Sequence, residues 1–268
     1  MAQVNPTAII RDGARIADDV EIGPYCVIGE GVEIGAGCRL ASHVVIIGNT
    51  TVGCDNVFSP FSAIGCDPQD LKYKGEPSTI TIGSRNCIRE YVTIHPGTRG
   101  GRMATVVGDD NLLMASSHVA HDCIVGSGNI FANSAALGGH VYIGNCVTLG
   151  GMVGVHQFCR VGDYVMLGAG SMVTRDVPPY AVAQGDRCKL RGVNLVALKR
   201  HGFSDSGISE IKRAYKQLFF SSGAFANRVE ALDSELLSSE LVKRILAFCG
   251  DSSRGLCPAA KSFSQAPT

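Results

Sequence analysis

Several patterns that would assign the chain to a common protein class are missing from its 268 residues. Charged residues make up only 18% of the chain and the formal net charge is zero, which argues against nucleic-acid binding through bulk charge. No run of 18 apolar residues is present, so hydropathy predicts no membrane span. The first residues lack the basic and then apolar segments of a secretory signal. These absences predict a soluble, cytoplasmic protein.

The eleven cysteines form no C-x-x-C pair and no spacing typical of a zinc site. Most of them are scattered through the segment with a six-residue repeat described below. We interpret them as small apolar side chains in a reducing compartment. A disulfide framework is therefore not expected.

The sequence does contain a strict six-residue period. An aliphatic or Phe residue recurs at every sixth position from Val4 to Ile64, from Ile82 to Ile94 and from Val107 to Val173. Neither a heptad nor a 3.6-residue helix gives this period, whereas hexapeptide repeats are typical of parallel β-helices. We therefore predict a prism-shaped solenoid in which three hexads close one coil. Residues i and i+18 would lie side by side, about 4.8 Å apart.

Two segments interrupt the period, and we expect both to form loops beside the solenoid. Residues 66–79 contain Gln69, Asp70 and Lys72, so this loop is either a ligand-binding element or an idle excursion. Residues 95–105 contain two arginines among glycines. That loop either contacts an anionic partner or is simply solvated.

The repeat is expected to end at Val173, because the next position in phase is Pro179. We predict a parallel β-helix over residues 1–185, an α-helical domain over 186–250 and a disordered tail over 251–268. The expected helices are Leu195 to Arg200, Ile208 to Phe220 with Ser206 as N-cap, and Arg228 to Phe248. Basic residues cluster on these helices, either as a solvated face or as a docking surface: Lys199, Arg200, Lys212, Arg213 and Lys216.

Four of the seven histidines lie between Leu113 and Val161: His118, His121, His140 and His156. The predicted coil places three pairs side by side: His121 with Gly139, Asp122 with His140, and His156 with Gly138. A neutral imidazole can remove a proton from an alcohol or amine, and a carboxylate can orient it. The N–H of Gly139 can approach a substrate closely and stabilise an oxyanion. A base and an oxyanion donor, with no G-x-S-x-G motif and no evident nucleophile, indicate direct acyl transfer.

Three other interpretations of the histidine cluster remain open at this point. Three imidazoles with an open position would suit a zinc hydrase. The histidines could instead bond only to turn carbonyls, or the solenoid could be a binding protein without activity. His43 lies apart from the cluster, and we expect it to be structural.

The chain resembles the UDP-N-acetylglucosamine O-acyltransferases of lipid A synthesis. The resemblance rests on PQDLKYKGEP, IREYVTIHPGT, DNLLMASSHVAHDC, GGMVGVHQF, DVPPYAVAQGD and GVNLVALKRHGF, and H-x-A-H-D-C followed by V-H-Q-F is specific among hexapeptide acyltransferases. It implies a left-handed parallel β-helix, assembled as a homotrimer with sites between subunits. It also implies transfer of an (R)-3-hydroxyacyl group from acyl carrier protein to the 3-hydroxyl of UDP-N-acetylglucosamine. We expect neither a metal nor a cofactor.

The same resemblance assigns roles to individual residues. His121 would be the general base, Asp122 its orienting partner and Gly139 the oxyanion donor. Residues implied in binding the nucleotide, the sugar or the acyl donor are Asp70, Lys72, His95, His118, His140, His156, Gln157, Asn194 and Arg200. The basic helices would dock the acidic carrier protein.

The chain departs from the family pattern at three positions. Val196 stands where relatives often have an acid, and His201 where a second Arg often follows. Ala169 occupies a position, often Gly, that is associated with acyl-chain length, so a shorter chain is expected. An N-acyltransferase of the same pathway is the nearest rival, but it typically has an additional N-terminal domain and lacks the H-x-A-H-D pattern.

Overall fold

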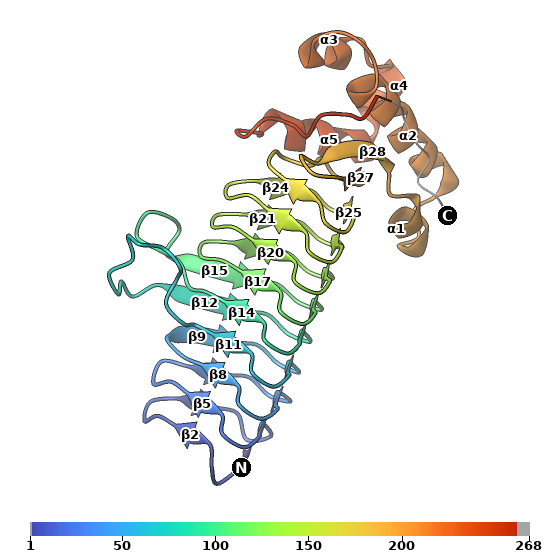
Figure 1. The fold of residues 1–268 in the computed structure, drawn as a ribbon. Helices are drawn as coiled ribbons and strands as arrows, with labels where there is room; N and C mark the ends of the chain where they lie inside the picture. Colours follow the sequence, from blue (N-terminus) through green and yellow to red (C-terminus); the bar gives the residue numbers. More distant parts are fainter. Residues whose placement is uncertain (1, 262–268) are drawn as a thin grey trace.

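The computed structural model describes residues 2–261, and its main body is a stack of short parallel strands (Figure 1). The strands form three sheets, which we call A, B and C. Successive strands along the chain lie on successive sheets, so each coil contributes one strand to each sheet. This arrangement is the prism-shaped solenoid that the six-residue period predicts.

Sheet A contains, in spatial order, β1 (Gln3–Val4), β4 (Glu21–Ile22), β7 (Arg39–Leu40), β10 (Val57–Phe58), β13 (Cys87–Ile88), β16 (Leu112–Leu113), β19 (Ile130–Phe131), β22 (Thr148–Leu149), β25 (Met166–Leu167), β27 (Ala181–Gln184) and β28 (Lys189–Val193). Sheet B contains β2 (Ile9–Ile10), β5 (Val27–Ile28), β8 (Val45–Ile46), β11 (Ala63–Ile64), β14 (Thr93–Ile94), β17 (His118–Val119), β20 (Ala136–Leu137), β23 (Gly154–Val155) and β26 (Met172–Val173). Sheet C contains β3 (Arg15–Ile16), β6 (Glu33–Ile34), β9 (Asn49–Val52), β12 (Thr79–Ile82), β15 (Ala104–Val107), β18 (Ile124–Val125), β21 (Tyr142–Ile143) and β24 (Arg160–Val161).

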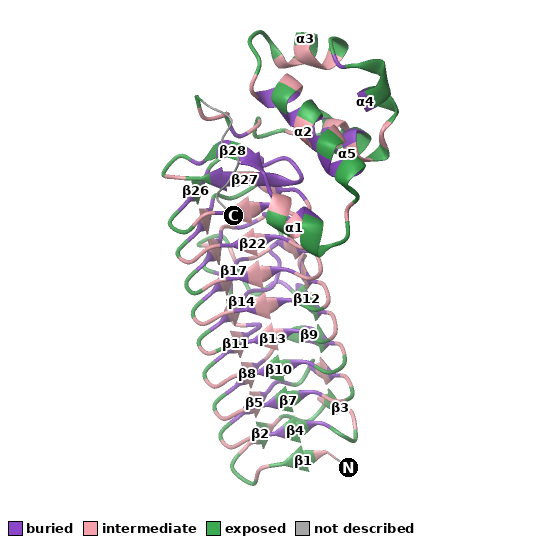
Figure 2. Cartoon of the chain, turned by 90° about the vertical axis from the view of Figure 1, so that its right-hand side faces the viewer, coloured by how far each residue is buried: buried purple, intermediate pink, exposed green. Residues whose placement is uncertain are grey.

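The register of these strands confirms the predicted coil, in which three hexads return the chain to the same sheet. His118 pairs with Ala136, which in turn pairs with Gly154. The second residue of each two-residue strand points into the prism, because neighbouring residues of a strand face opposite sides. These are the positions of the six-residue period, and Ile28 and Ile94, for example, are fully buried. Figure 2 shows that buried positions recur from coil to coil along the stack.

Both interruptions of the period lie at the same edge of the prism. We call this edge the B–C corner: the segments 65–78, 95–103, 120–123, 138–141 and 156–159, which connect a sheet B strand to the next sheet C strand. Parallel pairing continues on both sides of each interruption. The two loops project together from the stack (Figure 1).

The strand partners around each loop show how much chain it inserts. Across the first loop Ala63 pairs with Thr93 instead of Thr81, its regular i+18 partner, so the loop inserts the length of two hexads. Across the second loop Thr93 pairs with His118 instead of Asn111, so this loop inserts one hexad and one further residue. The stack therefore accepts insertions at this corner without losing its register.

The edge between sheets C and A is held by a ladder of buried asparagines. Asn86 N–H donates to Asn56 Oδ1 at 2.9 Å, and Asn111 N–H donates to Asn86 Oδ1 at 2.9 Å. Asn129 N–H and Val147 N–H continue the ladder at 2.9 and 2.7 Å. Each side chain thus satisfies a backbone N–H of the next coil, which water cannot reach.

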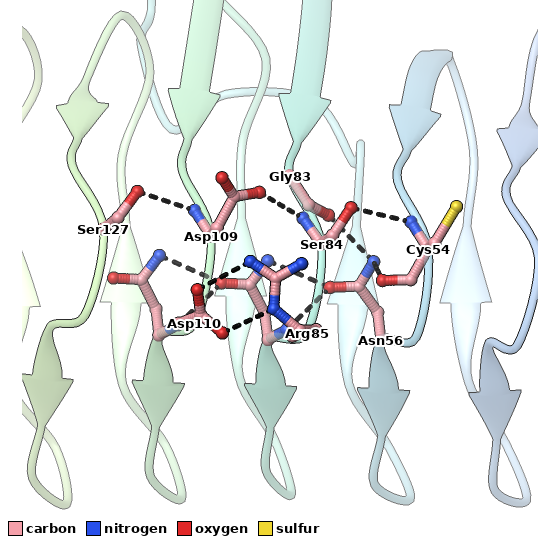
Figure 3. A network of polar contacts seen from close by, with 10 residues as sticks. Cys54, Asn56, Gly83, Ser84, Arg85, Asp109, Asp110 and Ser127 are labelled. Carbon is pink, nitrogen blue, oxygen red and sulfur yellow. Dashed lines mark hydrogen bonds and ion pairs between the residues drawn. The ribbon is translucent and has the colours of Figure 1, made fainter.

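A second, outer row of polar contacts runs parallel to this ladder (Figure 3). Ser84 N–H donates to Asp109 Oδ1 at 2.6 Å, and Asp109 N–H donates to Ser127 Oγ at 3.0 Å. Arg85 and Asp110 form a two-bond ion pair at 2.7 Å on the surface beside them. Neighbouring coils are therefore joined through side chains as well as through the strands.

The solenoid continues slightly beyond Val173, the position at which we expected it to end. Val161 pairs with Val177 and Leu167 pairs with Ala183, so the last register is i+16 instead of i+18. Strand β28 then turns back antiparallel to β27. The expected boundary at residue 185 therefore falls inside a sheet hairpin, and the first helix begins at Leu195.

Up to residue 261, the end of the described part, five helices follow: α1 (Leu195–Arg200), α2 (Asp205–Phe219), α3 (Phe225–Glu230), α4 (Ser234–Ser238) and α5 (Glu240–Gly250). The expected N-cap at Ser206 is wrong, because Ser204 Oγ accepts the N–H of Gly207 at 3.1 Å and caps α2. The single helix expected from Arg228 to Phe248 is also wrong. Ser239 has extended backbone angles and separates α4 from α5. Among the described residues, no helix is long and apolar enough to cross a membrane.

The expectation of a disordered tail is wrong for residues 251–261. This segment lies against the end of the solenoid, where Leu256 pairs with Asp176 and Ala259 pairs with Leu190. The buried carboxylate of Asp176 accepts the hydroxyl of Ser252 at 2.7 Å, and Cys257 is only 3% exposed. Backbone pairing and burial outweigh the polar composition of the segment. Residues 262–268 lie outside the described residues.

We predict that Asn86→Ala destabilises the protein through the asparagine ladder. The change leaves the buried N–H of Asn111 without its acceptor, and an unsatisfied buried donor costs about 1–3 kcal/mol. Thermal unfolding should therefore show a lower Tm for Asn86→Ala than for Asn133→Ala, a control at an exposed corner residue. Equal Tm values for the two variants would contradict a stabilising role of the ladder.

Candidate active site

The B–C corner aligns residues of successive coils in columns. His121 and Gly139 occupy the second position of their turns, and Asp122, His140 and Phe158 the third. The third position has a positive φ: 60° for Asp122 and 61° for His140. Asp and His tolerate this region better than most residues. The regular coil thereby brings together the residues that sequence reasoning paired by their spacing.

His121 and Asp122 form a dyad. The Nδ1 of His121 lies 2.8 Å from Oδ2 of Asp122, whose side chain is fully buried. An ionised carboxylate can only accept, so Nδ1 carries the proton and Nε2 keeps its lone pair. A neutral imidazole with a free Nε2 is the state that a general base requires.

The second loop folds over Asp122 and supplies further donors to its carboxylate. Thr98 donates its N–H and its hydroxyl to Oδ2 at 3.0 and 2.7 Å, and Arg102 N–H donates to Oδ1 at 2.6 Å. Burial alone would raise the pKa of Asp122, but the hydrogen bonds from His121, Thr98 and Arg102 outweigh it and hold the pKa below the usual value. Asp122 is therefore charged at neutral pH.

Gly139 lies directly against the ring of His121. A Cβ on Gly139 would lie 2.5 Å from His121 Nε2 and 2.4 Å from Cε1, so no larger residue fits without moving the ring. Within the part of the chain that the structure describes, the N–H of Gly139 has no hydrogen-bond acceptor. A donor beside the basic nitrogen is the arrangement that an oxyanion site needs.

His140 is held beside the dyad by aromatic contacts. Its ring stacks on Phe158 at 4.4 Å and meets the ring of His121 edge to face at 5.0 Å. Its Nε2 lies 4.0 Å from Asp122 Oδ2. Burial is the main cause that lowers the pKa of His140, so the ring is neutral at pH 7.

His95, from the preceding coil, and His118, from strand β17 just before the dyad, line the same site. His118 Nδ1 lies 2.7 Å from the hydroxyl of Thr93, whereas the buried Nδ1 of His95 has no partner among the described residues. Burial, with smaller effects of His118 and His121, lowers the pKa of His95 to about 4. The buried nitrogen of His95 without a partner stands out, because buried polar atoms are normally hydrogen-bonded.

Two cavities meet at His121. One, of about 570 Å³, follows the outer face of sheet B over small and apolar residues that include Ala136, Gly154 and Met172. The other, of about 820 Å³, lies between the two loops and the corner and is lined by charged residues such as Asp70 and Lys72. Both include Gln69, His121 and Gln157 among their lining residues. The dyad therefore stands between an apolar groove and a polar one.

The zinc alternative fits these contacts poorly. Ligand atoms of His121, Asp122 and His140 lie within 4.8 Å of one another. The Asp122 carboxylate, however, already accepts four hydrogen bonds, which is about the number of its lone-pair sites. His121 also directs Nδ1 at this carboxylate rather than at a common centre. The geometry favours an oriented base over a metal ligand set.

Three of the residues expected in the site lie elsewhere in the chain. Asn194 caps α1 through Ala197 N–H and donates to Tyr164 O at 2.8 Å, in the turn between sheets C and A. The exposed Arg200 lies on the same helix, on the side of the stack away from the loops (Figure 1). Ala169 lies in the turn between β25 and β26, at the opposite edge of sheet B from His121. One chain does not bring these residues to the dyad.

The basic residues that the sequence grouped into one cluster are divided between two helices, and one of them is ion-paired. Arg213 is paired with Asp233 and Glu235 at 3.1 and 2.9 Å. The exposed Lys199 and Arg200 lie on the separate helix α1. His43 lies away from the dyad, where its ring stacks on Phe61 at 4.9 Å.

Sequence reasoning missed several contributors to the site. Thr98 and Arg102 donate backbone N–H groups to Asp122, and Thr98 also donates its hydroxyl. Any residue type can supply a backbone donor, so most of this contact leaves little trace in the sequence. The guanidinium of Arg254, from the C-terminal segment, lies 3.2 Å from His156 Nδ1, although the two residues are distant in the chain. Phe158 could have been found, because it is the i+18 partner of His140.

We predict that His95 makes stability depend on pH between 7 and 5. The unfolded chain protonates this imidazole near its ordinary pKa of about 6.5, whereas the folded pKa is about 4. The unfolded state then binds more protons as pH falls, so stability is lost, by about 2 kcal/mol at pH 5 from this group. Tm should therefore fall less between pH 7 and pH 5 in His95→Phe than in wild type. His43→Phe is the control, and an unchanged slope in His95→Phe would contradict the burial of a neutral ring.

Comparison with known proteins places this geometry in a family. Residues 176–257 match the family described as Udp N-acetylglucosamine O-acyltransferase, domain 2, and residues 13–48 and 104–139 match the bacterial transferase hexapeptide family. The chain is 46% identical over 256 residues to the acyl-[acyl-carrier-protein]--UDP-N-acetylglucosamine O-acyltransferase of Thiobacillus denitrificans, and the match covers 96% of this chain and 99% of the relative.

Solved structures give the same result. LpxA from Acinetobacter baumannii matches with a TM-score of 0.92 at 43% identity, over 95% of this chain and 99% of that one. The UDP-N-acetylglucosamine acyltransferase of Francisella novicida matches with a TM-score of 0.92 at 36% identity, over 96% and 94%. These matches confirm the predicted fold, a left-handed parallel β-helix followed by helices. The chain belongs to the UDP-N-acetylglucosamine O-acyltransferase family.

Proposed function

We propose that the protein transfers an (R)-3-hydroxyacyl group from acyl carrier protein to the 3-hydroxyl of UDP-N-acetylglucosamine, the first step of lipid A synthesis in the cytoplasm. One observation carries the proposal: the ring of His121 lies against Gly139 where an apolar groove meets a polar cavity. An acyl chain suits the first and a sugar nucleotide the second. The names of the relatives support the same pair of substrates.

In this mechanism His121 Nε2 removes the proton of the sugar 3-hydroxyl. The oxygen attacks the thioester carbonyl, and the negative charge that forms on the carbonyl oxygen is stabilised by Gly139 N–H. Collapse of this intermediate breaks the carbon–sulfur bond, and the imidazolium returns its proton to the departing thiolate of the carrier. Asp122 stabilises the imidazolium throughout, because its carboxylate remains charged.

No acyl-enzyme is part of the proposal. Cys123 follows the dyad directly, but burial raises the pKa of its thiol to about 12. Its Sγ donates to Gly138 O at 3.2 Å. A thiol in this state is a poor nucleophile, since the thiolate is the reactive form.

The remaining site residues bind the substrates. We propose that the first loop, with Asp70 and Lys72, holds the acceptor in the polar cavity. Proposed contacts to the sugar or the acyl donor come from the corner columns: His95, His118, His140, His156 and Gln157. Ala169 would limit the length of the acyl chain at the far edge of sheet B, and the exposed lysines of α1 and α2 would dock the acidic carrier protein.

Asn194 and Arg200 reach the site only from a second copy of the chain. They lie on the side of the solenoid away from the loops, so no side-chain motion within one chain brings them to His121. We therefore propose a homotrimer in which α1 of one subunit completes the site of its neighbour.

We predict that His121→Gln lowers acyl transfer by about a hundredfold or more, the range for a lost general base. His43→Gln, at another edge of the same solenoid, is the matched control and should retain wild-type activity. The measurement is transfer from a 3-hydroxyacyl carrier protein to UDP-N-acetylglucosamine, with zinc content determined on the same samples. Unchanged transfer in His121→Gln would refute the base, and stoichiometric zinc without transfer would favour a hydrase.

We also predict that mixing two inactive variants restores activity. His121→Gln damages one part of a shared site and Arg200→Ala the other, so mixed trimers contain some sites with both wild-type residues. Co-expression of the two variants should give measurable transfer, well above that of either variant alone. Activity no higher than that of the separate variants, with trimers demonstrated by light scattering, would place Arg200 outside the neighbour's site.

A further inference from the structure

The two inserted loops are joined by one buried carboxylate. Glu76 belongs to the first loop and is only 7% exposed. Its Oε1 accepts the N–H of Arg99 in the second loop at 2.8 Å, and its Oε2 accepts the N–H of Lys74 in its own loop at 2.8 Å. These N–H groups are the main reason that the pKa of Glu76 lies below its usual value. The Glu76 side chain is therefore an anion held between two backbone N–H donors.

The second loop also contacts the His121–Asp122 dyad. Thr98, the neighbour of Arg99 in the chain, donates two hydrogen bonds to Asp122. Glu76 and Asp122 thus accept hydrogen bonds from the N–H groups of two consecutive residues of the loop.

Close packing limits movement at two points of the second loop, Gly97 and Gly101, whereas Gly100 faces open space. A Cβ on Gly97 would lie 2.1 Å from Ala104 N, and one on Gly101 would lie 2.3 Å from Asp122 Cγ. Both glycines approach their neighbours as closely as a residue without a side chain allows. Gly97 and Gly101 thus restrain the loop on either side of Thr98 and Arg99.

From these contacts we infer that Glu76 is a positioning residue that couples the first loop to the general base. Asp70 and Lys72 lie only a few positions before Glu76, on the wall of the polar cavity. A sugar nucleotide bound at that wall orders the first loop. The effect of this ordering reaches Asp122 and His121 through the contacts of Glu76, Arg99 and Thr98. The role of the acceptor in this coupling rests on the proposed function.

Glu76→Gln tests the coupling with little change of shape. The amide replaces one oxygen by an NH2 group, which faces a backbone N–H and cannot accept from it. Glu90→Gln is the matched control, since Glu90 lies in the turn between sheets A and B and pairs with Arg89. We expect Glu76→Gln to lower kcat about tenfold, the lower range for supporting contacts, and to raise the KM for the sugar nucleotide. Glu90→Gln should change neither.

A double-mutant cycle with Thr98→Val separates coupling from general damage. Because both residues act on Asp122 through one loop, the double variant should lose less activity than the product of the two single losses. Multiplicative losses, or a rise in KM with unchanged kcat, would overturn the inference. If Glu76→Gln fails to fold, Glu76→Asp replaces it in the cycle, because the shorter side chain cannot reach both donors.

A readout without substrate distinguishes failure of this inference from failure of the proposed function. The proton on His121 Nδ1, shared with Asp122, should give a downfield ¹H NMR resonance that is absent in His121→Gln. We expect it to shift or broaden in Glu76→Gln and to remain in Glu90→Gln. An unchanged resonance in Glu76→Gln would refute the coupling whatever the enzyme transfers. If the resonance changes as expected in Glu76→Gln but the wild-type protein transfers no acyl group, only the proposed function is refuted.

Discussion

Parallel pairing between residues i and i+18 is the constraint on which the rest of this structure depends. Each strand contributes only two residues to most pairings, so no single coil is stable alone and each needs the coils above and below. The inward residue of every strand fills the prism, and the asparagine ladder satisfies the buried turn between sheets C and A. Because the spacing is fixed, a residue at one position of a turn lies next to the residue at the same position of the turn in the next coil.

The B–C corner follows this alignment in its regular turns and departs from it in the two inserted loops. His121, Gly139 and Gln157 follow from the regular coil alone, as do Asp122, His140 and Phe158. The two insertions occur at the same corner, one and two coils earlier, and parallel pairing continues past both. They supply what a regular turn cannot: donors that keep a fully buried carboxylate charged, and a wall for a polar cavity. Regular repeats position the dyad, and irregular loops complete its environment.

In the proposed trimer, one subunit supplies the dyad and a neighbouring subunit supplies Asn194 and Arg200. His121 and Asp122, the proposed base and its carboxylate, and Gly139, the proposed oxyanion donor, come from consecutive coils of a single solenoid, so their geometry is set by folding. Asn194 and Arg200 belong to a helix and its cap that pack beside Tyr164 at another edge. A site of this kind would be catalytically equipped but unable to hold its full substrate until subunits meet.

The sequence by itself determined the solenoid, the length of its coil and the adjacency of His121, Asp122, Gly139 and His140, because a strict period converts spacing directly into position. Helix α1 was also predictable, since its pattern is local. Three features were decided only by the tertiary structure: the orientation of Asp122 toward His121, the grip of the second loop on that carboxylate, and the docking of residues 251–261. Each depends on backbone N–H and C=O groups or on contacts between distant segments. Backbone groups require no particular residue type, and contacts between distant segments do not follow from local spacing. Neither kind of contact can therefore be predicted from the sequence.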